Sequence, residues 1–169
     1  MQPSEALSAS AQVAVTLAGF AGVVVAFRSG SVHQWSNVDK FRLRILLMNS
    51  AMPFVLSILA MLLSSTALDQ DTVWQVCSVL AFVMIVVVGQ QMSRGLRRLS
   101  PEEFRAGGGS GVIFYSASVL GIAVMLLQLY NAITLKTFWP FFAAIAALLV
   151  LGMLQFVRLV MVGHDDVRS

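Results

Sequence analysis

Residues 41–57 read FRLRILLMNSAMPFVLS, so two arginines open an apolar run that carries an asparagine and a proline in its middle. The run continues without a charged residue to about residue 66. About 20 apolar residues are enough for a helix to cross the hydrocarbon of a bilayer. Asn49 and Pro53 therefore lie where a membrane span is normally most apolar, and this placement indicates either a polar path or a polar packing contact.

The rest of the chain has the composition of a membrane protein. Of its 169 residues, 58% are hydrophobic and 11% are charged, whereas a soluble domain has about a quarter of its residues charged. Five runs are long enough to span a bilayer, at about residues 6–27, 43–66, 72–92, 112–133 and 138–162. We expect an all-α, polytopic membrane protein in which residues 1–169 form a single transmembrane bundle.

The charges alternate between the predicted connections. Ten of the eleven Lys and Arg residues fall on one side of the membrane, and Lys136 is the exception. The connection between the second and third spans, ALDQD, carries two acids and no base. By the positive-inside rule the basic side faces the cytoplasm, so the N-terminus is predicted to lie outside and the C-terminus inside. We expect the chain in a bacterial inner membrane.

Two helix starts are readable on the basic side. Ser36 followed by Asp39 three residues later fits a helix N-cap, which predicts that the second span begins as a helix near Asn37. Ser100 and Pro101 followed by two acids predict a short cytoplasmic helix over about residues 101–106. The glycine-rich segment 107–111 then predicts a flexible joint.

Several kinds of site have no support in the sequence. No Asp, Glu, Lys or His falls in the middle of a predicted span, where proton relays and ion-coupled carriers usually place one. His33 and His164 are not at metal-ligand spacing, and Cys77 is the single cysteine. We therefore expect no enzyme activity, no metal, no cofactor and no nucleic-acid partner.

The second span carries a polar stripe. At 100° per residue its polar and small residues fall within an arc of about 100°; they include Arg42, Asn49, Pro53, Ser57 and Ser64. Pro53 has no N–H, so the carbonyl of Asn49 loses its helical donor. These groups must be satisfied by protein or by water in lipid. The stripe either bonds neighbouring helices at a kink or lines a water-filled path or ion site.

A group of polar side chains is predicted at one depth near the basic ends of three spans. Its members are Arg42, Gln90, Gln91, Arg94, Gln155 and Arg158. Gathered around one opening, they form a positive mouth that attracts anions. The alternative is that the arginines extend separately to anionic headgroups and only anchor the topology.

The first span carries small residues at every fourth position, namely Ser10, Ala14, Ala18, Gly22 and Ala26. Such a pattern lets two helices approach closely in lipid. It indicates either packing inside one subunit or a seam between subunits.

These features lead to two functional hypotheses. The first is a homo-oligomeric ion channel or passive pore lined by the second span, with a weak preference for anions. The alternative is a non-conducting accessory or scaffold subunit that docks a membrane-protein partner through the small face of the first span. In both, the lipid bilayer is the immediate environment.

Overall fold

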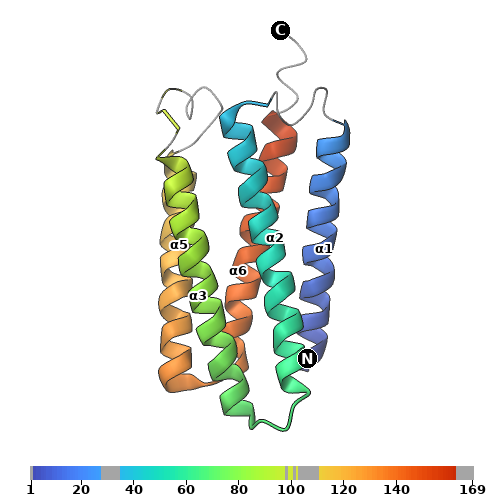
Figure 1. The fold of residues 1–169 in the computed structure, drawn as a ribbon, viewed down its shortest axis with the longest axis vertical. Coiled ribbons are helices and arrows are strands. Elements are labelled where there is room, and N and C mark those ends of the chain that lie inside the picture. Colours follow the sequence, from blue (N-terminus) through green and yellow to red (C-terminus); the bar gives the residue numbers. More distant parts are fainter. Residues whose placement is uncertain (1, 28–34, 98, 101, 103–110, 163–169) are drawn as a thin grey trace.

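Five long helices run side by side in the part of the chain that the computed structural model describes, residues 2–27, 35–97, 99–100, 102 and 111–162 (Figure 1). They are α1 (Pro3–Phe27), α2 (Asn37–Ser64), α3 (Gln70–Leu96), α5 (Gly111–Tyr130) and α6 (Phe138–Val162), and a short π-helical turn, η2 (Asn131–Leu135), continues α5. The all-α prediction is confirmed. Each helix is long and apolar enough to cross a membrane, so the chain is a multi-pass membrane protein.

The helices extend past the predicted spans at several ends. The first helix starts at Pro3, and the third continues to Leu96, one turn beyond the predicted end of its span. The predicted cap is confirmed, because the Ser36 hydroxyl accepts the backbone N–H of Asp39 at 3.1 Å. The predicted helix at 101–106 and the glycine joint lie outside the described residues, apart from Glu102 and Gly111.

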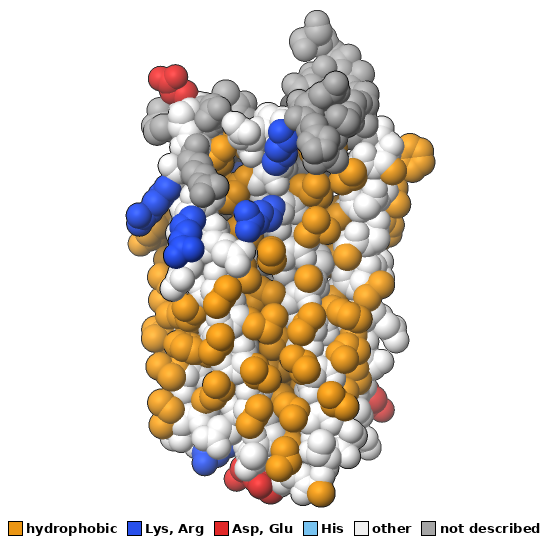
Figure 2. All heavy atoms as spheres, viewed as in Figure 1, with side chains coloured by type: hydrophobic (Ala, Val, Ile, Leu, Met, Phe, Trp, Pro, Cys, Tyr) orange, Lys and Arg blue, Asp and Glu red, His pale blue; other side chains and the backbone are white. Residues whose placement is uncertain are grey.

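Helices α2 and α6 form the centre of the bundle (Figure 1). Helix α1 packs against both on one side, and α3 and α5 complete the other side. We call the end at which α2 begins and α3 ends the basic end, and the opposite end, which carries Asp69 and Asp71, the acidic end. Figure 2 shows Lys and Arg side chains gathered near the basic end, with an apolar surface below them.

The half of the bundle toward the acidic end is filled by an apolar core. Residues from α1, α2, α3 and α6 contribute to it, with Leu56, Cys77, Phe141 and Ile145 among those almost fully buried. The Trp74 ring packs at 5.0 Å from the Phe138 ring at the outer edge of this core. An apolar core contributed by four helices therefore occupies this half of the bundle.

Buried amide side chains hold the acidic end of α5 and η2 in place. The Asn131 amide nitrogen donates to Ser78 Oγ at 2.6 Å and to the Thr137 carbonyl at 3.0 Å, and its oxygen accepts the Thr137 N–H at 3.1 Å. Gln128 donates to the carbonyl of Pro140 at 2.7 Å. Gln75 on α3 donates to a carbonyl of η2 at 2.9 Å. The acidic end of α5 is thus joined to both α3 and α6.

The other half of α5 is packed much less tightly. Residues 115–123 are exposed or half-buried, and the buried side chains of α5 that are described are Val124 and Gln128. Both lie toward the acidic end of the helix. Helix α5 is therefore anchored at one end and stands partly away from its neighbours at the other.

Candidate functional site

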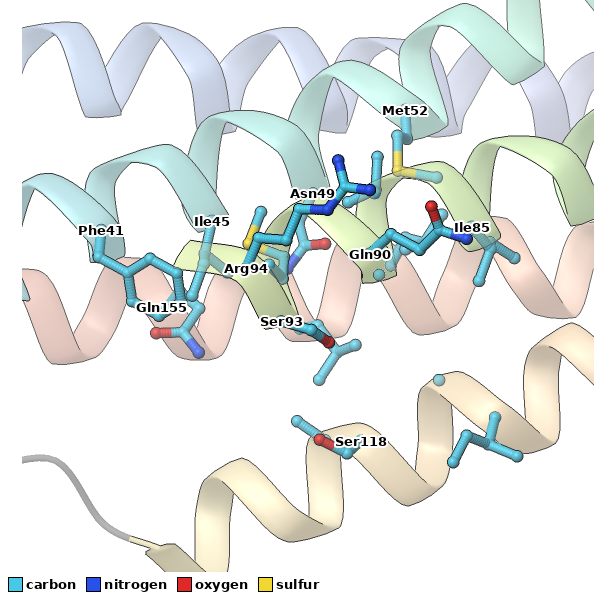
Figure 3. A pocket seen from close by; sticks show the side chains of 18 of the residues that line it. Phe41, Ile45, Asn49, Met52, Ile85, Gln90, Ser93, Arg94, Ser118 and Gln155 are labelled. Carbon is cyan, nitrogen blue, oxygen red and sulfur yellow. The ribbon is translucent and has the colours of Figure 1, made fainter. Parts of the chain in front are cut away.

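A cavity of about 650 Å³ occupies the basic half of the bundle, between α2, α3, α5 and α6 (Figure 3). It exists because the basic half of α5 is loosely packed, whereas α2 and α6 stay in close contact. We call it the basic cavity. Met52, Ile85, Met125 and Leu148 line its deepest part, and the apolar core lies beyond them.

Four arginines line the basic cavity, and no carboxylate does so among its described lining residues. Arg42 comes from α2, Arg94 and Arg97 come from the end of α3, and Arg158 comes from α6. Arg42 is 5% exposed and lies 3.8 Å from the Asp39 carboxylate, which offsets part of its charge. Guanidinium groups stay protonated at all physiological pH values, so the cavity carries a net positive charge.

Uncharged polar groups share the cavity with the arginines. In Figure 3 Asn49, Gln90, Ser93 and Gln155 lie on one side of the space, and Ser118 of α5 faces them from the other. Amides and hydroxyls offer hydrogen-bond donors that can complete the shell around an anion. The arrangement is therefore able to bind a negatively charged group close to the basic end.

The predicted mouth residues come together with one exception. Arg42, Gln90, Arg94, Gln155 and Arg158 all line the basic cavity. Gln91 does not, because it follows Gln90 by 100° of helix rotation and points to the other side of α3. There it accepts a hydrogen bond from Arg44 at 2.9 Å.

The polar stripe of α2 faces the interior of its own bundle. Asn49 lines the cavity and is 9% exposed, and Pro53 and Ser57 are buried. Ser64 lies in the last turn of the helix and is exposed. A path along this stripe would therefore run inside one chain, between its own helices.

Two buried polar atoms lie beyond the floor of the cavity. Ser57 Oγ and Gln128 Oε1 have no hydrogen-bond partner among the described residues, and both side chains are 0% exposed. Ser57 follows Asn49 by two turns of α2, about 12 Å. Burying such atoms without a partner costs about 1 to 3 kcal/mol each, so they are unusual features of an apolar half-bundle.

The small-residue stripe of α1 divides between two environments. Ser10 and Ala14 are buried, Ala18 is half-buried, and Gly22 and Ala26 are exposed. A step of four residues turns a helix by about 40° more than a full circle, so the stripe winds away from the bundle. Only its first half packs inside the subunit.

Some lining residues were missed in the sequence. Arg97 is one turn from Arg94, and that spacing was a usable signal. Ser93 and Ser118 gave no signal, because single serines are common in membrane helices. The buried Asn131 was also missed, since its role depends on a π-helical turn that ends at Lys136 in the left-handed region, at φ 50°.

No group of His, Cys, Asp or Glu suited to a metal ion occurs among the described residues. Searches with protein-family models, curated proteins and solved structures find no match to this chain. The chemistry of the basic cavity is therefore what bears on function.

Proposed function

We propose that the chain is a non-enzymatic membrane transport protein that passes small anions through the interior of its own bundle, entering through the basic cavity. The observation that carries this proposal is the convergence of four arginines from three helices on one cavity. Positive charge in a cleft with low-dielectric walls raises the local concentration of anions. Basic side chains also line known anion-selective pores.

A buried hydroxyl supports a route beyond the cavity. Asn49 lies at the cavity, and Ser57, whose Oγ has no hydrogen-bond partner among the described residues, is buried two turns further along α2. An anion that leaves the arginines needs hydrogen-bond donors such as this hydroxyl to replace its hydration shell. Because the apolar core closes the acidic half, we assign the structure to the closed state of the route, and Leu56 and Phe141 to its barrier.

The proposal includes an orientation and an assembly. By the positive-inside rule we place the basic end in the cytoplasm, the N-terminus outside and the C-terminus inside, in a bacterial inner membrane. We propose that the chain forms a homo-oligomer. In this assembly each chain carries its own route, because Asn49, Pro53 and Ser57 are buried inside one subunit.

Anion efflux from vesicles tests the proposal. The purified chain is reconstituted into vesicles loaded with chloride, and efflux is followed with a chloride electrode. We expect Arg94→Gln to lower the rate about tenfold, since one of the charges that concentrate the anion is lost. Arg44→Gln is the matched control, because Arg44 lies at the same end but outside the basic cavity. Efflux no faster than from protein-free vesicles would overturn the proposal.

A second candidate, an accessory subunit, is favoured by the exposed small face of α1. Atoms added at Gly19 or Gly22 would meet nothing within 4 Å, so a partner helix has free access there. Co-purification separates the candidates. An unrelated membrane protein at a fixed ratio favours the accessory, and a homo-oligomer favours the transport protein.

A further inference from the structure

The basic cavity is open on its flank, toward the bilayer. The lining residues that remain exposed all lie on α3 and α5, and they are Gly89, Gln90, Ser93, Arg94, Arg97, Ser118 and Ile122. The lining residues on α2 and α6 are buried or half-buried. The opening therefore lies between α3 and α5, and we call it the lateral mouth.

The lateral mouth reaches into the depth of the hydrocarbon. From Arg97 to Gly89 it follows α3 for about 12 Å. Next to its deep end α3 presents Val83 and Val87 to the outside, with 49% and 46% of their surface exposed. Exposed valines on a membrane helix face lipid chains. The mouth therefore begins at the level of the arginines and ends beside the acyl chains.

The chemistry changes along the mouth in the same direction. Arg94, Arg97 and Ser93 lie near the basic end, and Ile122, Ile85 and Met125 line the wall further in. Arginine binds phosphate oxygens with paired hydrogen bonds, and an apolar wall at membrane depth binds a hydrocarbon chain. A ligand that satisfies both has an anionic phosphate at one end and a long chain at the other.

We infer that an anionic glycerophospholipid from the leaflet at the basic end binds in the lateral mouth, with its phosphate at Arg94 and Arg97 and one acyl chain against Ile122. Charge complementarity selects this occupant, because Arg94 and Arg97 lie together at the mouth and the described lining residues include no carboxylate. The inference uses the cavity of the proposed transport route, but it does not depend on whether anions cross the membrane.

Native mass spectrometry of the full chain in a neutral detergent tests the inference. Phosphatidylglycerol, phosphatidylcholine with the same chains, and soluble glycerol phosphate are the three probes. We expect phosphatidylglycerol to bind at least about tenfold more tightly than either other probe, since the choline cation of phosphatidylcholine offsets the charge of its phosphate beside the arginines, and glycerol phosphate has no acyl chain. Equal binding of phosphatidylcholine would overturn the selection of an anionic headgroup. Equal binding of glycerol phosphate would overturn the inference that a lipid is the ligand, and it would leave the proposal of anion transport intact.

Tryptophan substitutions test the position of the chain. Ile122→Trp fills the lateral mouth, and we expect it to weaken phosphatidylglycerol binding about tenfold. Leu126→Trp is the matched control, because Leu126 lies one turn away on α5, is 55% exposed and does not line the cavity. Ser118→Trp, at the exposed rim of the mouth, replaces Ile122→Trp if that variant does not fold. Equal binding by the filled and control variants contradicts the proposed position.

Discussion

Gly152 of α6 lies directly against Asn49 of α2. A Cβ built on Gly152 would be 3.6 Å from the Asn49 Cβ and 3.7 Å from the Asn49 carbonyl oxygen. This is the carbonyl that loses its helical donor because residue 53 is proline. The two central helices therefore lie close together at the carbonyl that Pro53 leaves without its helical donor, and the small residue on α6 makes the approach possible.

The first prediction concerns this contact. Gly152→Ala places its new atom at ordinary van der Waals distance, and alanine favours a helix, so we expect unfolding free energy within about 1 kcal/mol of the unchanged protein. Gly152→Leu forces α2 and α6 apart and is expected to cost about 1 to 3 kcal/mol. Unfolding in mixed detergent micelles measures both. An equal effect of the two substitutions would show that the helices do not pack closely here.

The second prediction separates the polar stripe from the rest of the helix surface. Asn49→Leu replaces the amide at the cavity by a side chain of similar size, and we expect chloride efflux to fall to the level of protein-free vesicles, while the oligomer is retained on size exclusion. Gln91→Leu also replaces an amide by leucine, but Gln91 lies on the side of α3 that faces away from the cavity. This substitution should leave efflux unchanged. Normal efflux with Asn49→Leu would exclude Asn49 from the route.

The third prediction concerns the amide that anchors η2. Asn131 is 0% exposed and makes hydrogen bonds to both Ser78 and Thr137. Asn131→Ala leaves buried groups without partners, so we expect a loss of about 1 to 3 kcal/mol in unfolding free energy. Ser78→Ala removes one of these bonds and should cost less. A greater loss of unfolding free energy from Ser78→Ala than from Asn131→Ala would contradict the anchoring role of Asn131.

The fourth prediction is a pH dependence at the acidic end. Asp69 caps α3 by accepting the Thr72 backbone N–H at 2.9 Å, and this bond holds the pKa of the carboxyl below its usual value of 3.8. A lowered folded pKa means that the stabilisation is fully present above the usual value and is lost as the pH falls through the lowered one. Asp69→Asn keeps a capping side chain and should remove this contribution to the acid dependence of thermal stability. An unchanged acid profile would contradict the assignment.

The five long helices were predictable because apolar length is a property of each segment alone. The cap at Ser36 needs only a serine and the N–H three residues later, and it was predicted correctly. The anchor at Asn131 depends on a π-helical turn and on a left-handed Lys136, and it combines bonds to the nearby Thr137 with a bond to Ser78 of α3. No pattern in the neighbouring sequence predicts the π-helical turn or the left-handed conformation of Lys136.

The sequence predicted the depth at which the cavity residues lie, but it did not predict which face of each helix meets the cavity. Arginines at helix ends on the same side of the membrane must lie at one level, so their proximity followed from the order of the spans. Whether Gln90 or Gln91 faces the cavity depends on how α3 is turned, and only packing decides this. The stripe on α1 has the same limit, because a four-residue repeat drifts around the helix and Gly22 ends on the outside.

Because α5 is anchored at one end only, a change in its tilt would turn the helix about a point near Gln128. Gly111 is 17 residues from that point, about 25 Å along the axis, so a rotation of about 10° moves it by about 4 Å. The same rotation moves Val124 by about 1 Å. A small change in the tilt of α5 would therefore alter the width of the lateral mouth, and the hydrogen bond from Gln128 to Pro140 lies at the end of the helix that such a change would move least.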